Sequence, residues 1–180
     1  MSYAPWVIQP LTNITRGDSD EEERIGDSIR FKSFSIRGRF WFNNEPNFAD
    51  QFYYRRTFRI IVFWDLKPDT SGTAIDPYQM FTFSSGGNEQ YTNVYAFKRH
   101  DYRFRTKILY DRTYGIDNFH PQRHFKFSVK DPRMIQYNGN NNLINANLYL
   151  LIIASDGVPI LPNQPQTAVD YQYLLHYVDP

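Results

Sequence analysis

The stretch TRGDSDEEERIGDSIRFKSFSIRGRF, residues 15–40, decides the fold class of this chain. It leads from an acidic run through a Gly-Asp step into a long segment in which apolar residues alternate with polar or basic ones. A period of two is the pattern of a half-buried β-strand. The phase changes near Ser33, because strict alternation would point Phe31 and Phe34 to opposite faces. A β-bulge there would keep one apolar face, so we predict one long strand over 28–43.

Further strand signals follow along the chain and are separated by turn residues. Alternating or continuous apolar residues predict strands over 52–65, 78–83, 102–112, 123–130, 148–154 and 169–178. Aromatic residues make up 18% of the chain, which favours strands, and 11 Pro residues supply turns. The pattern predicts an all-β fold, a single jelly-roll β-sandwich of about eight antiparallel strands. An immunoglobulin-like sandwich is the main competitor.

Length and composition restrict the class of protein further. The 180 residues suit one domain over 1–180, with an N-terminal extension over 1–27 that leads into the first strand. Cysteine is absent, which excludes disulfides, thiolate metal sites and cysteine nucleophiles. No apolar run has the length of a transmembrane helix, and MSYAPWVIQP lacks the features of a secretory signal. We therefore expect no membrane partner.

Charge is distributed unevenly, although the net charge is only +1. Residues 1–23 carry one Arg and five acidic residues, residues 24–133 carry 19 basic and 11 acidic residues, and residues 134–180 carry three Asp. The basic middle is consistent with a surface that faces a polyanion, although a solvated sheet face would show the same excess. The candidate nucleic-acid contacts are the cations on the non-core faces of the first long strand: Arg30, Lys32, Arg37 and Arg39.

Catalytic and metal-binding motifs are weak, so we expect no enzyme. The chain lacks the HExxH, GxSxG, GxGxxG and P-loop sequences. His120 and His124 have the spacing of metal ligands on a helix, but Pro121 and the alternation after it oppose a helix there. The acidic run over 18–23 is either a structural Ca²⁺ site or a solvated loop. The expectation for cofactors is none, with Ca²⁺ as the exception to test.

The ordered set of motifs resembles the viral jelly-roll coat proteins. Residues 15–40 are similar to the first strand, and the segment before it, of the coats of tobacco-necrosis satellite viruses and of small circular single-stranded DNA viruses. TFRIIVFWDLKPDTSG at 57–72, YRFRTKILYDRTYGI at 102–116 and MIQYNG at 134–139 continue the resemblance in the same order. One departure is that such coats usually begin with an Arg-rich arm, and no basic arm is present here.

The resemblance implies a capsid protein that self-assembles into a small icosahedral shell of about 60 copies around a single-stranded nucleic-acid genome. It implies a location in the virion and, during assembly, in the host cell interior. It places the 28–43 strand in the sheet nearer the lumen and the strands over 52–65 and 102–112 in the opposite sheet. Subunit contacts are expected at Trp41, Tyr53, Arg55 and Arg103. The alternative is a carbohydrate-binding β-sandwich module with exposed Trp and Tyr.

Overall fold

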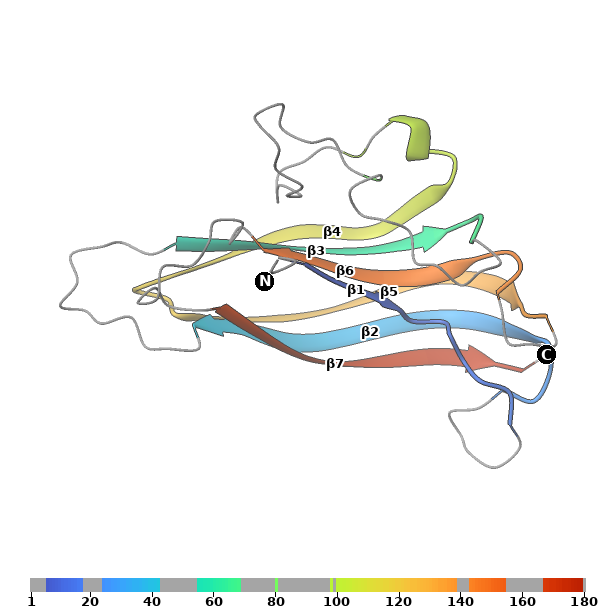
Figure 1. Ribbon diagram of the computed structural model, residues 1–180. Helices are drawn as coiled ribbons and strands as arrows, with labels where there is room; N and C mark the ends of the chain where they lie inside the picture. The colour runs from blue at the N-terminus through green and yellow to red at the C-terminus, as the bar shows by residue number, and fades with distance from the viewer. Residues whose placement is uncertain are drawn as a thin grey trace, which may run out of the picture.

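The computed structural model describes residues 6–17, 24–42, 55–68, 80, 98, 100–138, 143–154 and 167–179. The strands and one short 3₁₀ helix occupy most of them (Figure 1): β1 (Trp6–Pro10), β2 (Ser28–Phe42), β3 (Arg55–Asp65), η1 (His100–Tyr102), β4 (Thr106–Asp117), β5 (Gln122–Gln136), β6 (Asn147–Ala154) and β7 (Thr167–Val178). The predicted all-β sandwich is confirmed. The predicted strand over 78–83 lies outside the described residues, except for Met80.

The strands form two antiparallel sheets that pack face to face (Figure 1). One sheet has the order β1-β6-β3-β4 and the other has the order β5-β2-β7. Among the described strands, only β3 and β4 are consecutive strands of the same sheet, and every other pair of consecutive strands belongs to opposite sheets. This repeated passage between two sheets is the winding of a jelly roll. The sequence predicts about eight strands, and the described residues contain seven.

β2 has the buried face that its alternation predicts. Phe31 is buried before the change of phase, and Phe34 and Ile36 are buried after it. Against β7, Phe31 and Ser33 lie opposite the consecutive residues Tyr177 and His176, so Lys32 is the extra residue of a bulge. The register of β2 with β5 shifts at the same place, but there the extra residue lies on β5. The predicted bulge is confirmed. Without it, one half of the strand would turn its apolar side chains to solvent.

The core between the sheets is built around aromatic rings. Phe40 of β2 stacks on Phe58 of β3 with ring centroids 4.1 Å apart, and on Phe125 of β5 at 4.9 Å. Phe31 meets the Trp64 indole edge-on at 5.1 Å. All five rings are buried. Removal of each side chain from water stabilises the folded state by roughly 1.5–3 kcal/mol. This packing joins β2 to β3 across the sandwich.

β3 and β6 are covered on both faces, as their continuous apolar runs predict. A second apolar cluster lies on the side of their sheet away from the core and contains Ile61, Phe63, Met80, Tyr149, Leu151 and Ile153. Its members are at most 2% exposed. Met80 and the half-buried Tyr102 pack on this side, so segments before β4 supply the cover.

β4 begins later than its alternation predicts. The sequence favours a strand from Tyr102, but this residue belongs to η1 and the strand begins at Thr106. Arg105 fixes the turn, because its guanidinium donates to both carboxylate oxygens of the buried Asp65 at 3.0 and 2.9 Å. Thr106 Oγ1 also donates to the carbonyl of Tyr102 at 2.8 Å. The contact with Asp65 joins segments 40 residues apart, which a local period of two does not reveal.

The predicted N-terminal extension contains a strand that the sequence analysis missed. β1 pairs antiparallel with β6, from Trp6 opposite Ile153 to Pro10 opposite Tyr149. The long strand Ser28–Phe42 is therefore the second strand of the described chain, and its assignment as the first strand is wrong. A five-residue strand is too short to show a clear period in the sequence.

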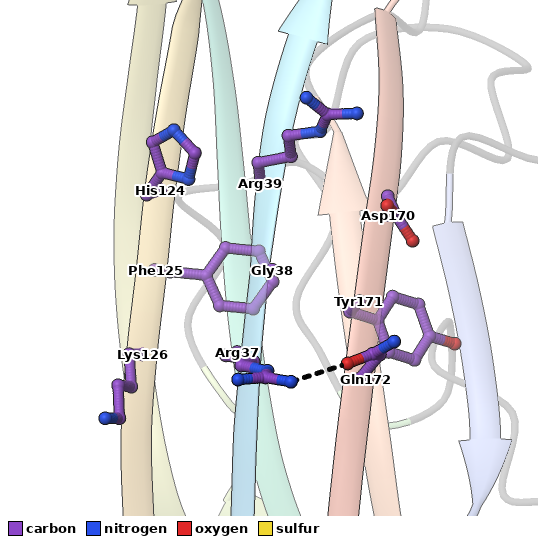
Figure 2. A pocket seen from close by; sticks show the side chains of 9 residues that line it. All are labelled: Arg37, Gly38, Arg39, His124, Phe125, Lys126, Asp170, Tyr171 and Gln172. Carbon is purple, nitrogen blue, oxygen red and sulfur yellow. Dashed lines mark hydrogen bonds between the residues drawn. The ribbon is translucent and has the colours of Figure 1, made fainter.

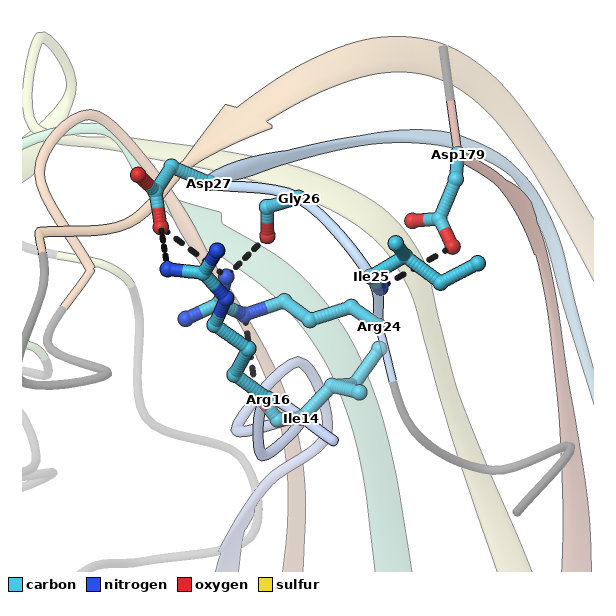
Figure 3. A network of polar contacts seen from close by, with 7 residues as sticks. All are labelled: Ile14, Arg16, Arg24, Ile25, Gly26, Asp27 and Asp179. Atoms are coloured by element: carbon cyan, nitrogen blue, oxygen red, sulfur yellow. Dashed lines mark hydrogen bonds and ion pairs between the residues drawn. The ribbon is translucent and has the colours of Figure 1, made fainter. Parts of the chain in front are cut away.

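Arg24 holds the segment before β2 in place (Figure 3). Its side chain is fully buried, and its Nη1 donates to the carbonyl of Gly26. The guanidinium lies over the ring of Tyr137, 4.0 Å from the centroid. The backbone N–H of Ile25 donates to Asp179 Oδ2 at 3.2 Å. These contacts connect the start of β2 to the ends of β5 and β7.

Candidate nucleic-acid interface

The outer face of the β5-β2-β7 sheet collects cations because its strands alternate. Ile36 and Phe40 of β2 are buried in the core, whereas Arg37 and Arg39 are exposed on the other side. The register between strands then decides which cations are neighbours. Lys126 of β5 lies directly opposite Arg37. Two strands that are distant in the sequence thus place like charges side by side.

Six exposed cations form what we call the basic face: Arg30, Lys32, Arg37, Arg39, Lys126 and Lys130. The three strands contain two carboxylates. Asp170 of β7 lies opposite Arg39, and Asp131 of β5 accepts a hydrogen bond from Lys107 of β4 at 2.8 Å. The face therefore has a clear excess of positive charge.

A groove of about 450 Å³ opens at Gly38 (Figure 2). All three strands line it, with side chains from Arg37 and Arg39, His124 and Lys126, and Asp170 and Gln172. A Cβ at Gly38 would meet the carbonyl oxygen of Asp170 at 2.3 Å and Cζ of Phe125 at 2.7 Å. The strands therefore approach this closely only because residue 38 has no side chain.

The contacts of the basic face orient its cations without neutralising them. Arg37 Nη2 donates to Gln172 Oε1 at 3.0 Å (Figure 2). The guanidinium of Arg39 lies over the Trp41 ring, 4.8 Å from its centroid. Among the ion pairs between described residues, none involves any of the six cations. Their charges therefore remain available to an anion from outside.

Several cations of the opposite sheet are paired with carboxylates. Arg59 donates to both oxygens of Asp111 at 2.7 Å, and Lys107 donates to a carboxylate of β5 at 2.8 Å. The pKa of the Arg105 guanidinium is raised above its ordinary value by the hydrogen bonds to Asp65. A cation that already has a carboxylate partner contributes little to phosphate binding. The basic face is therefore the better surface for a polyanion.

The four cations predicted as nucleic-acid contacts are exposed on one strand. Arg37 and Arg39 line the groove, Lys32 is the bulged residue, and Arg30 lies beyond the bulge. The sequence analysis did not select Lys126, which completes the groove. The alternation over 123–130 places its side chain on a polar face, but a single-strand pattern does not say that this strand pairs with β2.

The structure does not bring together the residues predicted for subunit contacts. Trp41 is half-buried beside Arg39. Arg55 is exposed at the start of β3, and Arg103 is exposed just before β4, at the other end of the β3–β4 pair. Arg55 belongs to the sheet opposite β2, as predicted, whereas Arg103 lies in the turn before β4 and not on the predicted strand. Tyr53 lies outside the described residues.

Two aromatic side chains outside this set are strongly exposed. Phe104 is 72% exposed and Phe119 is 78% exposed. The alternation places Phe104 on a core face, but the turn before β4 changes its direction. Phe119 lies in the turn between β4 and β5, where Asp117 Oδ1 accepts from its backbone N–H at 2.9 Å. Large exposed rings are typical anchors of protein–protein contacts.

Comparisons with known proteins identify no family. No protein-family model matches the chain, and no curated protein matches it. In the part of the chain that the structure describes, no group of three or more His, Cys, Asp or Glu side chains could hold a metal ion. The acidic run over 18–23 lies outside that part. No helix among the described residues has the length and apolar character needed to span a membrane.

Proposed function

We propose that this chain is a viral capsid protein that self-assembles into a small icosahedral shell around a single-stranded nucleic-acid genome. The observation that carries the proposal is the basic face on one sheet of the sandwich, where six exposed cations form no ion pair with any described carboxylate. Each phosphate contact releases counterions, so affinity for single strands falls with salt by a slope of roughly 0.7 per contact. In the proposed shell, this face lines the lumen.

The chemistry of the proposed protein is binding, and no reaction is assigned to it. Side chains on phosphate give affinity without reading the sequence of the bases, which suits a protein that must enclose a whole genome. Contacts between copies require apolar anchors elsewhere on the surface. Phe104 and Phe119 are such anchors, and neither belongs to the basic face. The virion, and the host cell interior during assembly, are the proposed locations.

The alternative, a carbohydrate-binding module, has less support. Such a module needs flat aromatic rings that are open to solvent, to stack on sugars. Trp64 is fully buried and Trp41 is half-buried beside Arg39. The side chain of Trp6 lies outside the described residues. The described tryptophans therefore favour packing roles over sugar binding.

The proposal is tested by the size and content of the purified protein. We expect electron micrographs to show uniform closed particles and sedimentation to give a mass many times the 21.5 kDa of one chain. Extraction of the particles should release single-stranded nucleic acid that is protected from added nuclease. A 21.5 kDa monomer that binds no oligonucleotide at low salt would refute the proposal. A monomer that is retained on immobilised polysaccharide would establish the alternative.

A further inference from the structure

Among the described strands, β7 lies at the edge of its sheet, and it lacks the features that keep edges from pairing. Its 12 residues, TAVDYQYLLHYV, contain no Lys, Arg or Pro. Natural sheets protect exposed edges with short strands, Lys, Pro or bulges. β1 has only five residues and ends at Pro10. β5 contains several cations and Pro132, and it lies beside β4. Among the four edge strands of the two described sheets, β7 is the unprotected one.

The edge at β7 also leaves apolar surface open. Leu174 is 57% exposed and Tyr173 is 41% exposed. Tyr173 lies on the core side of the strand, opposite the buried Ile36 and 5.9 Å from the Phe34 ring. Gln9 of β1 donates to its hydroxyl at 3.2 Å, but the exposure of the ring means that the core is only partly covered along this edge. The sheet has three described strands where the other sheet has four, and a further strand beside β7 would close the gap.

We propose that this strand is β7 of a second copy, paired antiparallel about a two-fold axis at Tyr173. In this register Tyr173 lies opposite itself, and Asp170 of each copy lies opposite His176 of the other. Opposite charges directly across a strand pair are favourable when the histidine is protonated. The same register pairs the whole of residues 168–178. Full overlap and charge complementarity thus select the same axis, and any other two-fold register separates Asp170 from His176.

The pairing would join two three-stranded sheets into one six-stranded sheet. A two-fold axis perpendicular to the sheet keeps both outer faces on the same side, so the two basic faces become continuous. The contact is isologous and closed, which limits it to two copies. It also covers an edge that would otherwise promote aggregation. The inference goes beyond the proposed function, since such a dimer can form with or without a shell.

Cysteine cross-linking tests the register directly, because the chain has no cysteine. Residues directly opposite each other in antiparallel strands have Cα atoms about 4.5–5.5 Å apart, within the range of a disulfide. Oxidation of the Tyr173→Cys variant should give a linked dimer of 43 kDa, twice the 21.5 kDa of one chain. The matched control is Val169→Cys on the same side of β7. In the proposed dimer the Cα atoms of residue 169 in the two copies would be about 27 Å apart. No disulfide-linked dimer of this variant should therefore form.

The two cysteine variants also separate this inference from the proposed function, because the linked dimer is read on a denaturing gel. Particles without the Tyr173→Cys cross-link would refute the pairing and leave the shell intact. Cross-linked dimers without particles would support the pairing and refute the shell. Equal cross-linking of both variants would refute the register. If the protein is a monomer and the amide hydrogens of β7 are protected from exchange with solvent, another part of the same chain covers the edge of β7. That result would also overturn the inference.

A charge test addresses the pair of Asp170 and His176. In the Tyr173→Cys background, His176→Asp would place two carboxylates opposite each other on both sides of the axis. We expect cross-linking to slow about fivefold. Adding Asp170→Asn removes the repulsion and should restore the rate. An unchanged rate in the first variant, or no recovery in the second, would refute the proposed register.

Discussion

Arg37 and Lys126 lie opposite each other on the basic face, and neither forms an ion pair with a carboxylate among the described residues. We expect Arg37→Gln combined with Lys126→Gln to reduce nucleic-acid binding while particles still form. Two lost phosphate contacts should lower the salt slope for single strands by roughly 1.4. The measurement is oligonucleotide affinity against salt concentration, together with the ratio of absorbance at 260 and 280 nm of the particles.

The control for this pair is Arg55→Gln combined with Arg103→Gln. These two cations are also exposed, but they lie with the opposite sheet. The control should therefore leave the salt slope and the absorbance ratio unchanged. If the control pair lowers both quantities and the Arg37 and Lys126 pair does not, the polyanion binds the opposite sheet.

Tyr137 should make the stability of the fold depend on alkaline pH. Burial raises the pKa of its phenol above the ordinary value of 10.0, and its hydroxyl donates to the carbonyl of Thr12 at 2.8 Å. Because the folded-state pKa lies above that of the unfolded chain, the stabilising effect is complete below about pH 10. It is lost as the pH rises from there toward the folded-state pKa.

The variant Tyr137→Phe isolates this effect. At pH 7 we expect a loss of about 1 kcal/mol in the free energy of unfolding, because a buried hydrogen bond disappears. Between pH 10 and pH 11.5 the decline should be shallower than in the unmodified protein. Urea titrations at several pH values measure both quantities. An equally steep decline in the variant would mean that other groups control the alkaline behaviour.

At the scale of the element, Gly38 determines how closely β2 approaches β7. A Cβ at this position would meet the backbone carbonyl oxygen of Asp170 at 2.3 Å, and backbone cannot move aside as a side chain can. We expect Gly38→Ala to lower the free energy of unfolding by about 1–3 kcal/mol. Urea unfolding followed by circular dichroism measures the change.

Gly115 of β4 provides the matched control for this substitution. The nearest atom to a Cβ there is the carbonyl oxygen of Arg56 at 3.9 Å, which is ordinary van der Waals contact. Gly115→Ala should therefore change the stability by no more than about 0.5 kcal/mol. Equal losses in the two variants would show that the close approach at Gly38 is not the cause.

The elements that could be predicted from the sequence are those with a local pattern of apolar residues. β2 with its bulge shows alternation, and the doubly covered β3 and β6 show continuous apolar runs. β1 is too short to show it, and the start of β4 depends on the distant contact between Arg105 and Asp65. The same limit applies to the residues of the basic face. The alternation of β2 revealed Arg37 and Arg39, whereas the choice of β5 as their neighbour depends on packing across the whole sandwich.

At the scale of the whole molecule, the exposed rings test whether copies associate through the turns. Phe119 is 78% exposed in the turn between β4 and β5, so Phe119→Ser should leave the fold and its unfolding temperature unchanged. We expect the same variant to reduce particle formation, because every copy loses an apolar anchor. Circular dichroism measures the fold, and sedimentation measures the particles. Normal particles from both Phe119→Ser and Phe104→Ser would exclude these rings from the contacts.

Strands near the start of the sequence pair with strands near its end, so the sheets can form only late in synthesis. Trp6 of β1 lies opposite Ile153 of β6. A ribosome that adds roughly 5–20 residues per second needs about 7–30 s to make the intervening chain. Through that interval β1 lacks its partner β6, and β2 waits for β7 about as long, since Ile36 lies opposite Tyr173. The polypeptide must therefore be synthesised through β7 before both sheets can form, and a premature stop codon before residue 167 would remove β7 from every product.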